Sequence, residues 1–554
     1  MGRVTGSLEA LYSDPVTAAA RAALLRRWRD TGRFRSDTLL DLVERAAAED
    51  PDARLVFASE THGGVTRVGD LAGRVREVAG AFAAVGVRKG DVVAMQLPNW
   101  PVTIEAYLGA VAAGAVIVPI VHTYGPTETG WILEASGASV LVCPDRWTSI
   151  DFHERLDTIP WAERGTVVMV GDDVHPGAVS WPDFLAGAGE PAESVEPTAL
   201  APADPLLVVY TSGTTAEPKG VLHSHETFIA ELFRMSQAPP ERRDWVVVQP
   251  WPAGHVAGLL AILSPLITRA TTVLIDRWDI ELLSEHIERY RPIAITGAPF
   301  HLGELLGRVE SGALDASSIR YAITGGASVP PVLVERADAA GWSLTRSYGS
   351  SEHPQATTTR FDDDLAVRIT TDGGPVADTE IRVVDADGDD VAPGTAGEIL
   401  LCGPQQFLGY TDPALNATAV DPDGWFHTGD VGVLDAHGRL TVTDRLKDII
   451  IRGGENLSSM EIEAIAVRHP AIADAAVIGV PDERYGERVG IVVVPAAGAA
   501  VVTVSDLRRF FADAGVAAAK TPELVTTIDE LPRNPAGKVK KHELRATVAF
   551  ATGP

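Results

Sequence analysis

The stretch at residues 210–220, Tyr-Thr-Ser-Gly-Thr-Thr-Ala-Glu-Pro-Lys-Gly, constrains this chain more than any other feature. An apolar run at 206–209 leads directly into it, which predicts a buried strand ending in a flexible, hydroxyl-rich loop. Such a loop turns backbone N–H groups and hydroxyls toward a polyphosphate, and Lys219 adds a positive charge. Five residues separate Gly213 from Lys219, so the spacing differs from that of the nucleotide-triphosphatase loop. The stretch therefore predicts a phosphate-binding loop of another kind.

Size and composition limit the classes of protein to which the chain can belong. At 554 residues it is too long for one hydrophobic core, so at least two domains are expected. An apolar content of 45% is ordinary for an α/β enzyme, and a net charge of −28 argues against nucleic acid or an anionic membrane surface as a partner. Cys143 and Cys402 lie far apart and suggest neither a metal cluster nor a disulfide framework, which fits a reducing cytoplasm.

Two segments bear on membrane association. The N-terminus mixes acidic and basic residues and lacks the apolar core of a signal peptide. The longest apolar run, 106–121, is short for a membrane span of about 20 residues and contains Pro119, which favours a buried helix followed by a strand. We therefore expect a cytoplasmic protein with no integral membrane association.

Hydrophobic periodicity alternates between helical and strand patterns through most of the chain. It predicts a helix over 66–85 and strands over 91–96, 115–120 and 271–275. This alternation predicts an α/β fold in which helices cover mainly parallel sheets. From about 380 to 443, short β segments with Asp/Gly turns predict a small β-barrel-like subdomain.

Charge is distributed unevenly along the chain. From Lys447 onward 13 Lys/Arg stand against 14 Asp/Glu, whereas the preceding residues carry 34 against 61. We therefore predict a large, acidic N-terminal domain over 1–446 and a smaller α+β C-terminal domain over 447–554. The segment 533–545 of the smaller domain is locally basic and would attract a polyanionic ligand.

Further motifs follow one order along nearly the whole chain. They are Pro-Trp-Pro-Ala-Gly-His-Val-Ala-Gly at 250–258, Gly-Gly-Ala-Ser at 325–328, Tyr-Gly-Ser-Ser-Glu at 348–352, Thr-Gly-Asp at 428–430, Arg-Leu-Lys at 445–447, Gly-Gly-Glu-Asn at 453–456 and Asn-Pro-Ala-Gly-Lys at 534–538. Together with 210–220 they resemble the motifs of the ATP-dependent adenylate-forming superfamily. This superfamily contains acyl-CoA synthetases, adenylation domains of peptide synthetases and beetle luciferases. The resemblance implies an AMP-forming acid–CoA ligase whose C-terminal domain is mobile.

The resemblance implies a nucleotide site built from several of these motifs. Glu352 would hold Mg²⁺ against the ATP phosphates, with Thr211 as a second metal contact, because a hard cation prefers oxygen ligands. Tyr348 would stack on adenine, and Asp430 would accept both ribose hydroxyls. The remaining residues assigned to cofactor binding in the main body are Ser212, Gly213, Thr214, Thr215, Lys219, Gly325, Gly326, Ala327, Gly349, Ser350, Ser351 and Arg445.

The C-terminal motifs imply a change of conformation between two half-reactions. Lys538 would be the essential cation of adenylation. Lys447 would mark the hinge, and Gly453, Gly454 and Glu455 would line the coenzyme A channel after rotation.

The segment around His255 is implied to form the acyl pocket, with His255 closing on the substrate carboxylate. Amino-acid-activating relatives carry an Asp in this motif, and 253–257 contains no acid, so an amino acid is disfavoured. The small residues suggest a roomy pocket, and the motifs resemble those of actinobacterial ligases for alicyclic and other bulky acids. The predicted pocket residues are Trp251, His255, Val256, Ala257, Gly258, Phe300, Gly325 and Gly349.

Three positions depart from the pattern of the superfamily. Ala216 stands where Gly is usual, Ser351 replaces Thr, and Lys447 replaces the commoner Asp. None of these changes removes a catalytic group, so we expect an active enzyme.

The expected reaction joins a carboxylic acid to ATP, giving acyl-AMP and pyrophosphate, and coenzyme A then gives acyl-CoA and AMP. Two other functions stay open. One is a stand-alone adenylating enzyme that loads a carrier protein or an amine, and the other is a non-catalytic ligand-binding relative. The expected partners are thus the acid, ATP and coenzyme A. The sequence leaves the exact acid and the quaternary state open, a homodimer included.

Overall fold

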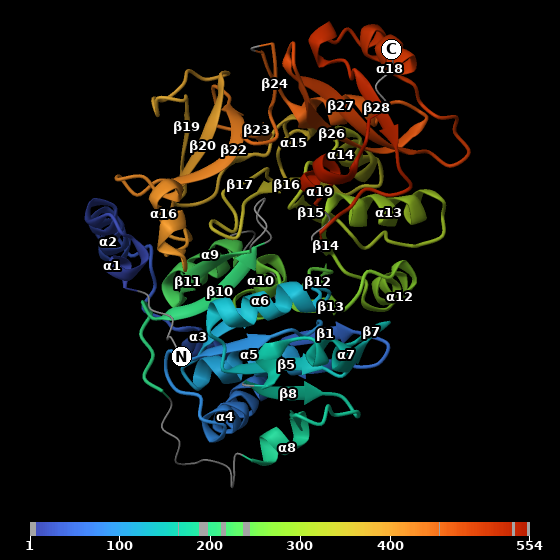
Figure 1. The fold of residues 1–554 in the computed structure, drawn as a ribbon. Coiled ribbons are helices and arrows are strands. Elements are labelled where there is room, and N and C mark those ends of the chain that lie inside the picture. Colours follow the sequence, from blue (N-terminus) through green and yellow to red (C-terminus); the bar gives the residue numbers. More distant parts are fainter. Residues whose placement is uncertain are drawn as a thin grey trace.

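The computed structural model describes residues 7–163, 165–187, 198–211, 218–236, 244–453, 455–534 and 538–550. Figure 1 shows a large body, coloured blue to yellow, and C-terminal elements in orange and red gathered at one end of it. The large body contains two long sheets, and two smaller sheets follow them in the sequence. Among the described residues, no helix is long and apolar enough to cross a membrane.

One long sheet has eight strands in the order β21-β11-β10-β4-β3-β5-β8-β9. The pairs from β10 to β9 are parallel, while β11 runs antiparallel to both of its neighbours. The strands are β3 (Val92–Met95), β4 (Val116–Pro119), β5 (Val140–Pro144), β8 (Thr166–Val170), β9 (Ala178–Ser180), β10 (Pro205–Thr211), β11 (Lys219–Ser224) and β21 (Gly409–Tyr410). A separate two-stranded ribbon is formed by β6 (Arg146–Trp147) and β7 (Ile150–Asp151).

The other long sheet has nine strands in the order β18-β17-β16-β15-β14-β12-β13-β1-β2. Its central pairs are parallel, and antiparallel strands close both edges. The strands are β1 (Arg54–Ala58), β2 (Gly64–Arg67), β12 (Val246–Gln249), β13 (Thr271–Ile275), β14 (Ala294–Gly297), β15 (Tyr321–Gly325), β16 (Ser343–Tyr348), β17 (Thr357–Thr358) and β18 (Gly374–Pro375).

Helices pack between and around these two sheets. Leu55 and Phe57 of β1, Val93 and Met95 of β3, and Phe82 of α4 belong to one buried apolar cluster, which joins both sheets through a helical layer. The helices of the body are α1 (Leu8–Leu11), α2 (Pro15–Asp30), α3 (Leu39–Glu49), α4 (Val68–Ala84), α5 (Pro101–Ala112), α6 (Pro126–Ser136), α7 (Phe152–Asp157), α8 (Trp181–Ala186), α9 (His225–Ser236), α10 (Val256–Leu263), α11 (Pro265–Thr268), α12 (Ile280–Tyr290), α13 (Pro299–Glu310), α14 (Pro331–Ala339), α15 (Leu365–Thr370) and α16 (Pro413–Ala419). The prediction of parallel sheets covered by helices is confirmed.

The subdomain predicted near 380–443 is an antiparallel sheet in the order β19-β20-β22-β23. Its strands are β19 (Glu380–Val384), β20 (Ala396–Cys402), β22 (Phe426–Leu434) and β23 (Leu440–Arg445). Asp435 and Gly438 lie in the turn between the last two strands, as their turn-forming character predicts.

The C-terminal elements form a mixed α+β unit with its own apolar core. Its sheet runs β25-β24-β27-β26, and β28 pairs parallel with β27. Ile450, Val477, Ile491, Leu507 and Phe511 are buried together within it. The elements are β24 (Ile450–Arg452), β25 (Glu455–Leu457), α17 (Ser459–Ala466), β26 (Ile472–Asp482), β27 (Gly486–Pro495), α18 (Val504–Asp513), β28 (Leu524–Thr527) and α19 (Lys541–Thr547).

Six histidines in the fold have a pKa well below the usual 6.5, because burial removes water from the charged imidazolium. They are His223, His225 and His255, with a pKa of about 4, and His122, His301 and His353, with a pKa of about 3. Between pH 6.5 and about 4 the unfolded chain binds protons at these positions and the folded chain largely does not, so stability falls as the pH drops through this range. A shift in the pKa of one histidine from 6.5 in the unfolded chain to 4 in the folded chain lowers the free energy of unfolding at pH 5 by about 2 kcal/mol.

We therefore expect the melting temperature to fall when the pH is lowered from 7.5 to 5. Thermal unfolding followed by circular dichroism at half-unit pH steps measures the effect. A melting temperature that stays constant or rises over this range would contradict the burial of neutral histidines.

Candidate active site

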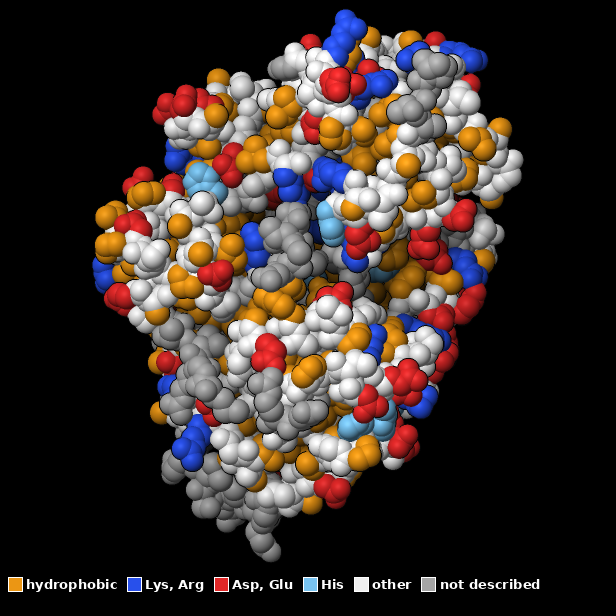
Figure 2. Space-filling model, viewed as in Figure 1, with side chains coloured by type: hydrophobic (Ala, Val, Ile, Leu, Met, Phe, Trp, Pro, Cys, Tyr) orange, Lys and Arg blue, Asp and Glu red, His pale blue; other side chains and the backbone are white. Residues whose placement is uncertain are grey.

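A large cavity of about 1480 Å³ lies where the ends of β10, β15 and β16 meet the antiparallel sheet and the C-terminal unit. Residues from all three parts of the chain line it, including Thr211, Gly325, Asp430 and Lys538. Figure 2 shows the face on which the molecule is hollowed, with Lys, Arg and His side chains gathered near the opening. Its location at the carboxyl ends of parallel strands is typical of ligand sites in α/β folds.

Three side chains form one hydrogen-bonded group where the antiparallel sheet meets the cavity. Asp430 and Arg445 are cross-strand partners in β22 and β23, and Arg445 Nε lies 2.8 Å from Asp430 Oδ1. The hydroxyl of Tyr348 donates to Asp430 Oδ2 over 2.7 Å. Burial and then the charge of Asp430 hold the pKa of Tyr348 well above 10, so its hydroxyl keeps its proton.

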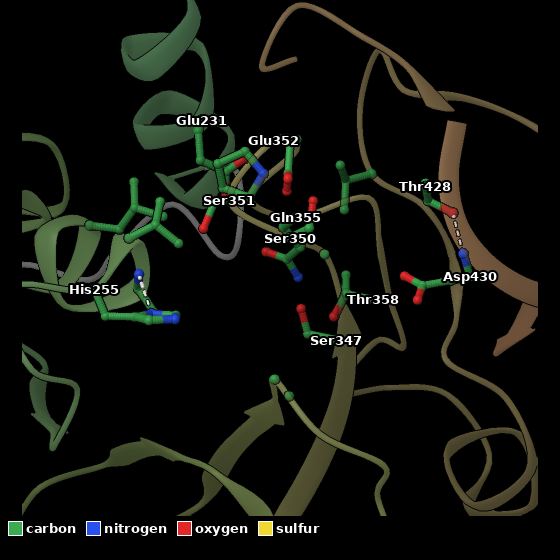
Figure 3. A pocket seen from close by; sticks show the side chains of 18 of the residues that line it. Glu231, His255, Ser347, Ser350, Ser351, Glu352, Gln355, Thr358, Thr428 and Asp430 are labelled. Atoms are coloured by element: carbon green, nitrogen blue, oxygen red, sulfur yellow. Dashed lines mark hydrogen bonds between the residues drawn. The ribbon is translucent and has the colours of Figure 1, made fainter. Parts of the chain in front are cut away.

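The backbone N–H of Asp430 donates to Thr428 Oγ1 over 3.0 Å (Figure 3). The Asp430 carboxylate is thus oriented by Tyr348 and Arg445 and neutralised by Arg445, while Thr428 holds the backbone of Asp430. Each carboxylate oxygen has a second lone pair, so the group can still accept hydrogen bonds from ligand hydroxyls.

A second group of side chains surrounds Glu352. Tyr410 donates from its hydroxyl to Glu352 Oε1 over 2.7 Å. Lys219 Nζ lies 5.3 Å from the centre of the Tyr410 ring. Lys219 lies near Tyr410 because β21 pairs with β11, with Val221 opposite Tyr410. The Phe407 N–H donates to the Glu352 carbonyl over 2.8 Å and places Glu352 beside Tyr410, on the cavity wall that also holds Lys219.

The predicted phosphate loop joins two paired strands. Thr211 at the end of β10 is the register partner of Lys219 at the start of β11, and both line the cavity. The predicted strand at 206–209 is therefore confirmed as part of β10. Ser212, Gly213, Thr214 and Thr215, which complete the predicted loop, lie outside the described residues, as does Gly454.

Lys538 brings a positive charge from the C-terminal unit into the cavity. Its pKa is lowered by burial and by the positive charge of Arg445, whereas Asp430 and Glu352 raise it. The lysine of the last motif therefore lies among the charged residues of the main body. Lys447 also lines the cavity, and burial followed by the charge of Arg445 lowers its pKa to about 8.

His255 caps the N-terminus of α10 on another side of the cavity (Figure 3). Its Nδ1 accepts a hydrogen bond from the backbone N–H of Ala257 over 3.3 Å. Burial, and then the charge of Lys538, lower the pKa of His255 to about 4, so the ring is neutral at physiological pH. Because Nδ1 is the acceptor, the proton lies on Nε2, which can donate to a ligand oxygen.

The structure places the other predicted residues in two groups. Trp251, Val256, Ala257, Gly325, Gly326, Gly349, Ser350 and Ser351 line the cavity. Gly258, Phe300, Ala327, Gly453 and Glu455 are not among the residues that line it. Gly453 and Glu455 lie exposed at the turn between β24 and β25, outside the cavity.

Gly258 and Phe300 were predicted to line the pocket, and neither does, for separate reasons. A Cβ on Gly258 would lie 1.9 Å from the carbonyl oxygen of Pro252, so this glycine supports the backbone beneath the pocket. Phe300 is 46% exposed and packs beside Trp278 and His301 on α13.

Comparisons with known proteins assign the chain to a family. Residues 43–411 match the AMP-binding enzyme family, and residues 461–538 match the AMP-binding enzyme C-terminal domain. The chain belongs to the AMP-binding enzyme family. The prediction of an adenylate-forming ligase is thereby confirmed.

Individual members of the AMP-binding enzyme family align over most of the chain. The 3-[(3aS,4S,7aS)-7a-methyl-1,5-dioxo-octahydro-1H-inden-4-yl]propanoyl:CoA ligase of Rhodococcus jostii (strain RHA1) is 36% identical, over 91% of this chain and 95% of the relative. The medium-chain fatty-acid–CoA ligase of Escherichia coli (strain K12) is 31% identical, over 94% and 92%. An amide bond synthetase structure from Marinactinospora thermotolerans has a TM-score of 0.80 at 28% identity, over 92% and 99%.

The cavity of this AMP-binding enzyme contains polar residues that the motifs did not predict. Glu231, Arg234 and Gln355 line it, and Tyr410 orients Glu352. Glu231 and Arg234 are three residues apart on α9, a spacing that places two helical side chains on one face. That spacing was visible in the sequence, but the direction of the face depends on how α9 packs.

Proposed function

We propose that this chain activates a carboxylic acid with ATP and then transfers the acyl group to the thiol of coenzyme A. The observation that carries the proposal is the meeting of Lys538 with Glu352, Asp430 and Arg445 in one cavity. These residues come from segments far apart in the sequence, and their charges suit a nucleotide that is anionic at one end and rich in hydroxyls at the other.

In the first half-reaction, a carboxylate oxygen attacks the α-phosphorus of ATP, and the bond to pyrophosphate breaks with its electron pair on the leaving group. The acid is already ionised at neutral pH, so the attack needs no general base. The obstacle is the approach of two anions. In our proposal, Lys538 and Lys219 stabilise the negative charge as it shifts toward pyrophosphate, and Nε2 of His255 donates to the carboxylate and orients it.

The proposed nucleotide contacts follow the geometry of the site. Asp430 would accept the ribose hydroxyls, held in place by Tyr348 and Arg445. Adenine would lie against Tyr348 and the backbone of Gly325 and Gly326. Gly326 has a φ of +77°, and a Cβ on Gly325 would lie 2.6 Å from the Ser347 carbonyl, so this backbone favours glycine.

We further propose that Glu352 and Thr211 hold Mg²⁺ together with the phosphates. Tyr410 occupies Glu352 Oε1 and leaves Oε2 available as a hard oxygen ligand. Mg²⁺ in nucleotide sites is usually bound by one or two protein oxygens plus phosphate oxygens, which fits the absence of larger acidic or His/Cys metal clusters among the described residues. When bound, the ion would neutralise charge on the leaving pyrophosphate.

In the second half-reaction, the sulfur of coenzyme A attacks the acyl carbon and loses its thiol proton to solvent. The bond between the acyl carbon and the AMP phosphate oxygen breaks, and AMP leaves with the electron pair. We propose that the C-terminal domain, 447–554, rotates about Lys447 between the steps. The support is that Lys538 occupies the cavity while Gly453 and Glu455 lie outside it, so the conformation described presents only the first of these segments. The ion pair between Arg545 Nη2 and Asp448 Oδ1, which are 2.7 Å apart, lies within this domain and would move with it.

For the acid we propose a bulky, alicyclic substrate. The relative from Rhodococcus jostii acts, by its name, on a propanoyl group carried by a methylated, dioxo-substituted bicyclic ring. Val121, Val256 and Leu260 give part of the cavity an apolar lining suited to such a ring. We also propose a cytoplasmic setting, consistent with two buried free thiols at Cys143 and Cys402. We further propose a homodimer, which analytical sedimentation would test.

A second candidate is an adenylating enzyme that passes the acyl group to an amine. The observation in its favour is the structural similarity to an amide bond synthetase. The acceptor test supplies purified acyl-adenylate with coenzyme A, with a carrier protein, or with simple amines, and compares the rates of AMP release.

The proposal predicts acid-dependent exchange of labelled pyrophosphate into ATP. The acids would be cyclohexane-type, terpenoid, aryl and linear C6 to C18 compounds. We expect exchange with bulky ring acids and thioester formation when coenzyme A is added. Exchange only with linear acids would overturn the proposed substrate class, and no exchange with any acid would favour a non-catalytic relative.

A further inference from the structure

A buried ion pair that belongs to none of the predicted motifs forms part of the cavity wall. Arg234 Nε lies 3.0 Å from Glu231 Oε2, and Arg234 Nη2 contacts the other carboxylate oxygen. The Glu231 side chain is 1% exposed and that of Arg234 is 11% exposed, so the pair is almost removed from bulk water. Figure 3 shows Glu231 near Ser351 and Glu352 and on the same side of the view as His255.

Gln355 extends this pair from a distant part of the sequence. Arg234 Nη2 donates to Gln355 Oε1 over 2.5 Å. A guanidinium only donates, so this contact fixes the amide with its oxygen toward Arg234 and its NH₂ group away from it. No hydrogen bond within the described part of the chain uses Gln355 Nε2 or Arg234 Nη1, and neither atom is among the buried unpaired atoms. Both side chains line the cavity, which leaves these donors available to a ligand.

The charge balance of the group selects the kind of ligand atom it can bind. Glu231 already neutralises Arg234, so a second carboxylate on the substrate would gain little from Arg234 and would be repelled by Glu231. A carbonyl or ether oxygen carries no net charge, so it can accept hydrogen bonds here without needing a net positive charge and without being repelled by Glu231. Such an oxygen can take hydrogen bonds from Gln355 Nε2 and Arg234 Nη1 while the apolar wall at Val256 and Leu260 contacts the carbon skeleton.

We infer that Arg234 and Gln355 recognise a neutral hydrogen-bond acceptor, such as a ketone, on the acyl part of the substrate. This inference rests on the proposed function and specifies the class of acid further. The substrate class is a bulky acid with one ionised carboxylate, which reacts, and an additional uncharged oxygen. In this assignment Glu231 is a positioning residue that holds Arg234 and excludes dicarboxylic acids.

Three acids of similar shape test the inference. They are 3-(4-oxocyclohexyl)propanoate, 3-cyclohexylpropanoate and 3-(4-carboxycyclohexyl)propanoate, compared by kcat/KM for pyrophosphate release. We expect the kcat/KM of the keto acid to exceed that of the unsubstituted acid by about tenfold, because the bound unsubstituted acid would displace water from Gln355 Nε2 and Arg234 Nη1 without replacing its hydrogen bonds. The dicarboxylate should be the poorest of the three.

Substitutions at two positions, Gln355 and Glu231, separate a loss of recognition from a general loss of activity. In Gln355→Leu, and in Gln355→Met as a second variant, the ratio of kcat/KM for the keto acid to that for the unsubstituted acid should fall toward one. In Glu231→Gln, Arg234 gains an uncompensated charge, so the ratio of dicarboxylate to keto acid should rise about tenfold. Glu310→Gln is the matched control, because Glu310 forms a comparable two-point pair with Arg336 outside the cavity. This control should leave all three ratios unchanged.

The outcomes distinguish this inference from the proposed function. Turnover of several ring acids with equal kcat/KM for the keto and unsubstituted acids would overturn the inference alone. A preference that survives both Gln355 variants, or a wild-type preference for the dicarboxylate, would also overturn it. Absence of acid-dependent pyrophosphate release with every acid would overturn the proposed function itself.

Discussion

Lys538→Ala is expected to slow acid adenylation by about 100- to 1,000-fold, the usual cost of removing one preorganised charge from a transition state. Transfer of the acyl group from preformed acyl-adenylate to coenzyme A should remain largely intact. The reason is that Lys538 lies among Asp430, Glu352 and Arg445 in the conformation described, whereas Gly453 and Glu455 are outside the cavity. Pyrophosphate release and thioester formation, measured separately on the same preparation, give the two rates.

A neighbouring lysine provides the control for this substitution. Lys540 is two residues away, pairs with Glu543 at 2.8 Å and does not line the cavity. Lys540→Ala should therefore retain both half-reactions. Equal loss of both steps in Lys538→Ala would show that Lys538 supports the fold or the second step, and the assigned role would then be wrong.

Glu352→Gln is expected to reduce adenylation by about 100-fold and to raise the Mg²⁺ concentration needed for half-maximal rate. The amide keeps the volume and one acceptor oxygen but loses the negative charge that would hold the ion against the phosphates. Initial rates of pyrophosphate exchange over a Mg²⁺ titration measure both effects. The titration should be carried out at fixed free ATP.

Tyr410→Phe tests the role of the Glu352 carboxylate with a smaller change. It removes the 2.7 Å hydrogen bond to Glu352 and leaves the charge in place, so the loss should be about tenfold or less. A Mg²⁺ dependence that is the same in wild type and Glu352→Gln would contradict the proposed metal contact. A larger loss in Tyr410→Phe than in Glu352→Gln would do so as well.

The parts of this fold that the sequence predicted are those in which local pattern and tertiary structure agree. The apolar run at 106–121 forms the end of α5 and the whole of β4, as the helix-then-strand interpretation requires. The run at 206–209 forms part of β10, and every side chain in it is buried, which agrees with the continuous apolar pattern of a strand in a helix-covered sheet. Asp430 and Arg445 were assigned to one nucleotide from their motifs, and the pairing of β22 with β23 places them side by side.

The residues that the sequence did not predict depend on contacts between distant segments. Glu352 alone gives no indication of Tyr410, because their hydrogen bond depends on contacts between distant segments: β21 pairs with β11, and the Phe407 N–H donates to the Glu352 carbonyl. Glu231 and Arg234 form an ordinary helical pair in the sequence, and only the packing of α9 beside Gln355 directs them to the cavity. Phe300 was expected in the pocket, yet its place in the first turn of α13 leaves it substantially exposed.

The central claim is that Lys538 and Glu352 act on one nucleotide, which is cleaved between its α and β phosphorus atoms. Phosphorus NMR of ATP incubated with the enzyme, a ring acid and coenzyme A tests it most directly. We predict equal amounts of AMP and pyrophosphate, formed only when the acid is present and nearly lost in both Lys538→Ala and Glu352→Gln. Formation of ADP and phosphate, or cleavage that persists in both variants, would contradict the claim.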